Sequence, residues 1–155
     1  MTRPRPVPGS TEDGSAVVEF VFVAVVVLVP LLYLVLAASL LQRNAFAVTE
    51  AAREAGRAFA TADDEAAGLE RAGYAVEVAL ADQGLEPAGT LVRWVAAGTG
   101  CGGPEVVPTL APGAEFTVCV VRSFRLPAVP GYLDEGANTV SGQFTLHVDD
   151  FRSRR

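Results

Sequence analysis

An uncharged apolar run from Phe20 to Leu41 is the feature that most constrains this chain. The run consists mainly of Val, Leu, Ala and Phe, and Pro30, Tyr33 and Ser39 are its only interruptions. A helix needs about 20 apolar residues to cross a bilayer, so the segment predicts one transmembrane helix. Pro30 removes a backbone hydrogen bond from that helix, and we expect a kink there rather than a break.

Glu19 lies directly before this run and is the most informative single residue. A charged side chain at the centre of a bilayer costs about 2.5–3.5 kcal/mol, and less near an interface. An acidic residue in a membrane helix is therefore a functional candidate by default. The alternative is a carboxylate that reaches back to the headgroups and has no further role.

Changes of composition along the chain predict its organisation. Residues 1–14 are rich in proline and glycine and predict a disordered leader. Residues 15–42 are predicted to form the transmembrane helix, and the alanine-rich, proline-free residues 43–60 predict that the same helix continues beyond the membrane. Residues 61–155 then suffice for one small domain.

A second helix is predicted after residue 60. Thr61 and Asp64 have the spacing of a capping box, and Gly84 followed by Pro87 is typical of a helix end. The residues predicted to form its apolar face are Leu69, Gly73, Val76 and Leu80.

Beyond Pro87 the chain becomes rich in β-branched and aromatic residues. The predicted strands are Thr90–Ala96, Glu115–Phe124 and Gln143–Val148. Two long connections rich in glycine or proline, Gly98–Gly113 and Pro127–Asn138, are typical of mobile or partner-binding segments. The predicted fold class is α+β, with a long helix against which a shorter helix and a small antiparallel sheet pack.

The chain has two cysteines, Cys101 and Cys119, and both follow the membrane helix. This pattern predicts one disulfide in an oxidising compartment, and two unpaired buried thiols are the alternative. Alternation along the second strand places Cys119 on the face opposite Phe116. No metal site is predicted, because His147 is the only histidine and no Cys-x-x-Cys spacing occurs.

Composition and motifs argue against several classes of function. The net charge is −6, and an acidic surface disfavours nucleic-acid binding, which needs a basic face. The glycine-rich stretch 98–103 lacks the Lys-Ser/Thr ending of a phosphate loop. His147 has no suitably spaced nucleophile. We therefore predict no enzyme, no cofactor and no small-molecule substrate.

Arg53 and Arg57 lie four residues apart on the helical extension, where Glu50 and Glu54 supply partners at i,i+3. This spacing predicts either a docking face or an ordinary solvated helix surface.

The run Gly14-Ser15-Ala16-Val17-Val18-Glu19-Phe20 resembles the processing motif of type IV pilin-class proteins. In that class a membrane aspartyl peptidase, the prepilin peptidase, cuts after the glycine, and a glutamate is the fifth residue of the mature chain. Counted from Ser15, Glu19 is fifth. The resemblance thus implies roles in processing and assembly for Gly14, Ser15, Glu19 and Phe20.

The alanine- and arginine-rich stretch 50–58, the short helix and the cysteine-bearing β segment resemble a TadE-like pseudopilin. These proteins form the TadE–TadG family of the tight-adherence (Flp-type) pilus assembly system. The resemblance implies a non-enzymatic minor pilin or pilus-assembly subunit. Its implied partners are the membrane, other pilin or TadE-like subunits, the assembly machinery and the prepilin peptidase.

The resemblance also implies a single-pass protein of the bacterial cytoplasmic membrane, with a cytoplasmic N-terminus and an extracytoplasmic C-terminal domain that either enters a surface pilus or acts at the membrane. Arginine counts on the two sides of the helix do not set this orientation, because they lean slightly the other way. Two alternatives stay open. One is a signal-anchored extracytoplasmic binding domain unrelated to pili, and the other is a secreted protein cleaved near Ser39.

Overall fold

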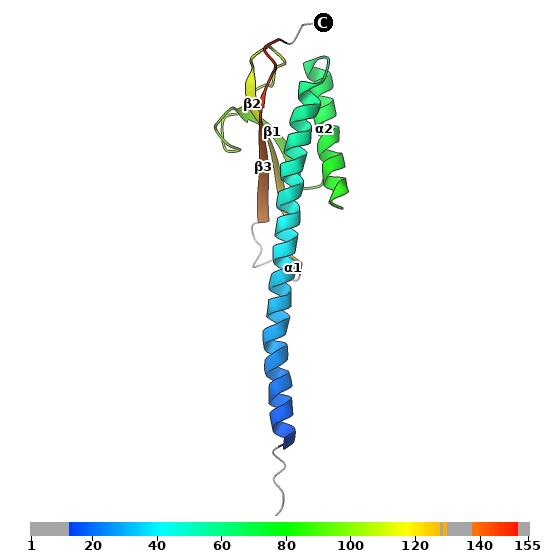
Figure 1. Cartoon of the computed structure of the whole chain (residues 1–155), viewed down its shortest axis with the longest axis vertical. Coiled ribbons are helices and arrows are strands. Elements are labelled where there is room, and N and C mark those ends of the chain that lie inside the picture. Colours follow the sequence, from blue (N-terminus) through cyan, green and yellow to red (C-terminus); the bar gives the residue numbers. More distant parts are fainter. Residues whose placement is uncertain (1–12, 128, 130–137, 152–155) are drawn as a thin grey trace, which may run out of the picture. The chain divides into compact units, whose positions relative to one another are not determined.

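The computed structural model describes residues 13–127, 129 and 138–151, with side chains from residue 16 onward. The chain divides into two compact units, Met1–Ala38 and Ser39–Arg155. Helix α1 (Asp13–Ala60) contributes to both units, and the other helix and the strands belong to the second (Figure 1). The predicted α+β class is confirmed, because a long helix is followed by a shorter helix and a small antiparallel sheet.

Helix α1 is unbroken over its 48 residues and contains both segments predicted as helical. It continues through Pro30, and the kink predicted there stays a prediction. The helix begins at Asp13, so Gly14 and Ser15 lie in its first turn. The first 12 residues of the predicted leader lie outside the described part of the chain.

Helix α2 spans Glu65–Asp82. Its N-cap is Asp64, whose carboxylate accepts a hydrogen bond from the backbone N–H of Ala67 at 2.8 Å. Thr61, predicted to open a capping box, has another role, because its hydroxyl donates to the Arg57 carbonyl at 3.0 Å. That prediction was wrong because a hydroxyl just after a helix can bond the last free carbonyls of the helix before it.

The buried face of α2 also differs from the predicted one. The buried residues of α2 are Gly68, Ala72, Val76, Ala79 and Leu80. Leu69 and Gly73, predicted on that face, are exposed. A Cβ at Gly68 would lie 2.8 Å from Cδ2 of Phe59 in α1. The face of α2 that meets this ring therefore carries Gly68 and not the larger Leu69.

The sheet is antiparallel with strand order β1-β2-β3, and its strands are β1 (Thr90–Ala96), β2 (Glu115–Phe124) and β3 (Asn138–His147). The bounds of β1 and β2 match the prediction. Strand β3 begins at Asn138 instead of Gln143, because Asn138 pairs with Phe124 and Gly142 with Val120. Pairing with β2, rather than the local β propensity of residues 138–142, sets this boundary.

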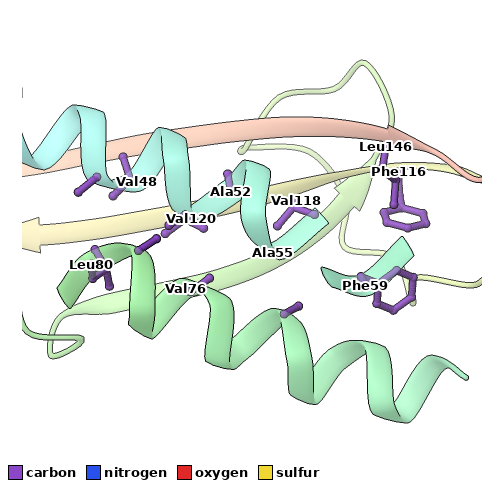
Figure 2. Close-up of a cluster of buried hydrophobic side chains, with 14 of the residues drawn as sticks. Val48, Ala52, Ala55, Phe59, Val76, Leu80, Phe116, Val118, Val120 and Leu146 are labelled. Atoms are coloured by element: carbon purple, nitrogen blue, oxygen red, sulfur yellow. The ribbon is translucent and has the colours of Figure 1, made fainter. Parts of the chain in front are cut away.

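One apolar core lies between the two helices and the facing side of the sheet (Figure 2). The labelled core residues are Val48, Ala52, Ala55, Phe59, Val76, Leu80, Phe116, Val118, Val120 and Leu146. Phe59, Trp94 and Phe116 form an aromatic cluster with ring centroids 4.9, 5.4 and 5.4 Å apart. Tilted and edge-on aromatic pairs of this kind stabilise a core beyond the area they bury.

Glycine sets the closest approach between helix and sheet. A Cβ built at Gly142 of β3 would collide with the backbone carbonyl of Val48 in α1. A Cβ at Gly56 of α1 would lie 2.6 Å from Cδ1 of Phe144 in β3. Both positions lack a side chain, and this allows α1 to cross β3 at backbone distance.

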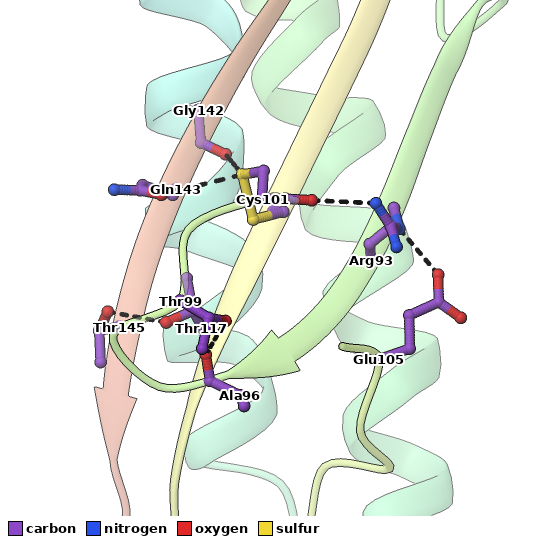
Figure 3. Close-up of a disulfide and its surroundings, with 10 residues drawn as sticks. Arg93, Ala96, Thr99, Cys101, Glu105, Thr117, Gly142, Gln143 and Thr145 are labelled. Carbon is purple, nitrogen blue, oxygen red and sulfur yellow. Dashed lines mark hydrogen bonds and ion pairs between the residues drawn. A yellow bond between two sulfur atoms is a disulfide. The ribbon is translucent and has the colours of Figure 1, made fainter. Parts of the chain in front are cut away.

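The connection between β1 and β2 covers the opposite face of the sheet (Figure 3). The predicted disulfide is present, joining Cys101 in this connection to Cys119 of β2, with a Cα–Cα distance of 5.5 Å. Cys119 is fully buried and, as predicted, lies on the face opposite Phe116. Arg93 of β1 adds a hydrogen bond to the Cys101 carbonyl at 2.9 Å and an ion pair with Glu105 at 2.7 Å. This connection is therefore tied to the sheet at several points.

Candidate functional site

The first candidate region is the N-terminal half of α1, which belongs to the first unit. One segment of the described chain, within Ala16–Ala60, is long and apolar enough to cross a membrane. None of the residues in its most apolar window is buried. Val18 and Phe20, which flank Glu19, are 69% and 73% exposed. This half of the helix therefore presents its apolar surface outward.

Glu19 is exposed in the second turn of α1, with Ser15 one turn earlier. Residues at i and i+4 of a helix lie on the same face, so the backbone places the amide nitrogen of Ser15 and the Cβ of Glu19 on one side of the helix. An acid near a helix N-terminus also interacts favourably with the helix dipole. The helix thus brings Ser15 and Glu19 together, whereas Phe20 points to the next position around the circumference.

The second candidate region is the exposed stripe of α1 within the second unit. Phe46, Glu50, Arg53 and Arg57 are separated by four, three and four residues and are all exposed. The predicted i,i+3 ion pairs are present, Arg53 with Glu50 at 3.9 Å and Arg57 with Glu54 at 3.2 Å. Pairs this exposed contribute little to stability, so they do not account for the stripe by themselves.

A groove lies beside this stripe, between α1 and α2. Its cavity volume is about 460 Å³, and its lining residues are Glu50, Glu54, Tyr74, Ala75, Val78, Ala79, Asp82 and Gln83. Alanines at 75 and 79 leave room between the helices, and Tyr74 stands 69% exposed at the edge. The lining carries three carboxylates and no basic residue. Neither the sequence pattern of α1 nor that of α2 indicates this groove, because each helix supplies only one wall.

Arg122 is a buried residue whose importance the sequence analysis missed. It is 8% exposed and lies on the core side of β2, beyond Val120. Its Nε donates to Oδ1 of Asn44 at 2.9 Å, and its Nη1 donates to the carbonyl of Glu86 at 2.6 Å and to Oγ1 of Thr90 at 2.8 Å. The sequence did carry a signal for this burial, because Arg122 occupies the same alternating positions of β2 as the apolar residues Val118 and Val120.

Glu65 joins the start of α2 to the chain before β2. Its Oε1 accepts hydrogen bonds from the backbone N–H of Leu110 at 3.2 Å and from the hydroxyl of Thr109 at 3.4 Å. The Leu110 bond is the main cause that holds the pKa of Glu65 below its ordinary value. Glu65 is thus a tether between elements rather than a group poised for proton transfer at neutral pH.

His147, at the end of β3, lies near two carboxylates. Its Nδ1 lies 3.1 Å from Oε1 of Glu115, and its Nε2 lies 3.7 Å from Oδ2 of Asp150. All three side chains are more than half exposed. Within residues 13–127, 129 and 138–151, no cluster of three or more His, Cys, Asp or Glu is placed to hold a metal ion.

No protein-family model matches this sequence, and no curated protein or solved structure shows significant similarity to it.

Proposed function

We propose that this chain is a pilin-like, TadE-type subunit: a minor pilin or pilus-assembly protein held in the bacterial cytoplasmic membrane by α1. The single observation that carries the proposal is Glu19, an acidic residue in the second turn of α1, directly before its uncharged apolar run and five positions after Gly14. A carboxylate in this setting calls for a compensating charge.

Processing would create that charge. Hydrolysis of the peptide bond after Gly14 adds one water, leaves a carboxylate on Gly14 and frees an ammonium group at Ser15. This cation lies one helical turn from Glu19 of its own chain and is equally available to Glu19 of a neighbouring helix. Pairing between subunits offsets part of the cost of placing both charges in lipid and makes assembly selective for one register.

One further feature supports an extracytoplasmic second unit. Disulfides persist in oxidising compartments, and Cys101 and Cys119 are paired. A single-pass anchor with its folded unit outside the cytoplasm accounts for this pairing.

Mass spectrometry of the N-terminus of the full chain from its native membrane tests the processing step. We expect a chain that starts at Ser15. An intact Met1 supports the signal-anchored binding domain instead, and a soluble product that starts near Ser39 supports secretion.

The Glu19→Gln variant tests the assembly step. We expect normal membrane insertion, because the amide is easier to place in lipid than the carboxylate, together with a strong loss of pili. Glu70→Gln is the matched control, since Glu70 is an exposed carboxylate of α2 outside the membrane helix. Normal piliation in the Glu19→Gln strain would remove the role proposed for this carboxylate.

A further inference from the structure

We propose that the groove between α1 and α2 receives the exposed arginines of α1 from a second copy of this chain. The inference rests on the proposed function, since it identifies how one assembled subunit contacts the next. The arginine ridge comprises Phe46, Arg53 and Arg57 of α1. The acidic groove is the cavity between α1 and α2, and its lining residues are Glu50, Glu54, Tyr74, Ala75, Val78, Ala79, Asp82 and Gln83. Both surfaces belong to the second unit.

The chemistry of the groove fits an arginine-bearing helix. Glu50 and Glu54 line one wall, and Asp82 lies on the other, so the cavity attracts cations along its length. Tyr74 presents an exposed ring in the same groove. A guanidinium group combines well with both features, because it forms paired hydrogen bonds with carboxylates and stacks on aromatic rings.

The arginine ridge fits the groove in turn. The side chains of Arg53 and Arg57 are 55% and 68% exposed, and their described ion pairs are confined to the same helix. Phe46 is 69% exposed, although it belongs to the folded unit and not to the apolar run before Leu41. This helix face thus presents two largely exposed guanidinium groups, each paired only within its own helix, beside a large exposed apolar ring.

Helix geometry gives the register of the contact. When the Phe46–Arg57 segments of two neighbouring copies run parallel at equal height, Arg53 and Arg57 of one copy lie three residues further along the helix than Glu50 and Glu54 of the other. A shift by three residues, about 4.5 Å along the helix axis, brings Arg53 and Arg57 opposite Glu50 and Glu54 of the neighbour at once. The contact is head-to-tail, because the ridge of one copy enters the groove of the next, so it can propagate through many copies.

Charge reversal in the full chain tests this pairing. Two differently tagged copies are co-expressed, solubilised from membranes in mild detergent, and the fraction that co-purifies is measured. We expect Glu50→Arg with Glu54→Arg to lower co-purification about tenfold, and Arg53→Glu with Arg57→Glu to lower it equally. Reversal of Arg71, an exposed arginine of α2 outside the groove, is the control and should leave co-purification unchanged.

Two rescue experiments separate lost pairing from misfolding. Mixing the acid-reversed copy with the arginine-reversed copy restores opposite charges at every junction, and so does the fourfold variant that carries all the changes in one chain. We expect both to regain at least half of the wild-type co-purification. The proposal is overturned if the single reversals have no effect or if neither combination restores association.

A photo-crosslinking residue in place of Tyr74 locates the contact. We expect a crosslink to a second copy within residues 46–57, identified by mass spectrometry of the digested dimer. Crosslinks confined to another protein, to lipid or to other parts of the chain contradict the proposal. The proposed function has its own readouts, the Ser15 start and the Glu19→Gln variant. A failed crosslink with a Ser15 start would therefore remove only this interface.

Discussion

At the scale of single residues, Arg122 shows how this small core holds a buried charge. The described acceptors of its guanidinium group are neutral oxygens from α1, β1 and the chain that precedes β1. Asn44 contributes twice, since its Nδ2 also donates to the carbonyl of Leu40 at 2.8 Å. A neutral acceptor satisfies the Arg122 donor without adding a second buried charge, whose desolvation would be costly.

We expect Asn44→Ala to lower the free energy of unfolding by about 1–3 kcal/mol, because a buried donor of Arg122 is left without its partner. Thr49→Ala is the control: the Thr49 hydroxyl bonds only the Ala45 carbonyl among the described contacts, and its loss should change stability by less than about 0.5 kcal/mol. Urea titration of the full chain in detergent, followed by Trp94 fluorescence, measures both. Equal stability of the two variants would contradict this role of Asn44.

Glu65 gives a pH dependence whose sign follows from its hydrogen bonds. Its pKa is lowered in the folded chain, chiefly by the Leu110 N–H, so its contribution to stability is fully present above its ordinary pKa. That contribution is lost as pH falls through the lowered folded pKa. We expect Glu65→Gln to melt below wild type at pH 7 and the gap to close at acidic pH. Melting temperatures between pH 7 and 3 test this, and a gap that widens on acidification would refute it.

At the scale of elements, the crossing of α1 over β3 depends on missing side chains. We expect Gly142→Ala to destabilise the second unit by about 1–3 kcal/mol. The added methyl group would meet the backbone of Val48, which cannot rotate away as a side chain can. Gly73→Ala in α2 is the matched control, since nothing lies within 4 Å of an added Cβ there. Alanine is the better helix former, so this control should gain up to about 1 kcal/mol. Thermal melts of the two variants in parallel decide the matter, and a neutral Gly142→Ala would disprove the close crossing.

At the scale of the whole molecule, the second unit combines a small apolar core with one disulfide. The core has helices on one face of the sheet, and on the other face the disulfide joins residues 18 apart in sequence. Closing a loop of this length removes conformational freedom from the unfolded chain. The β1–β2 connection can therefore lie over the sheet although glycine and proline make it intrinsically flexible.

We expect replacement of Cys101 and Cys119 by serine to cost about 3 kcal/mol. The helices should persist in this variant, because neither α1 nor α2 contains a disulfide cysteine. Far-ultraviolet circular dichroism measures whether the helix content is unchanged. Denaturant titration of the same full-length variant measures the loss of stability. Wild-type chain treated with a reductant should behave like the variant, and a difference between them would point to an effect of the serines themselves.

The sequence by itself determined the features that depend on neighbouring residues. The long helix, the bounds of β1 and β2, and the opposite faces of Phe116 and Cys119 follow from local composition, period-2 alternation and turn residues. The i,i+3 pairs of Arg53 and Arg57 follow from helix geometry alone. These properties repeat within one or two turns of helix or a few residues of strand, so they can be read along the chain.

Tertiary structure alone decided which of several locally equivalent faces became buried. The start of β3 depends on pairing with β2, and the burial of Gly68 instead of Leu69 depends on the ring of Phe59. The acidic groove and the acceptors of Arg122 bring together residues that are far apart in sequence. The physical reason is that burial and close approach are properties of pairs of surfaces, whereas a sequence pattern describes only one surface at a time.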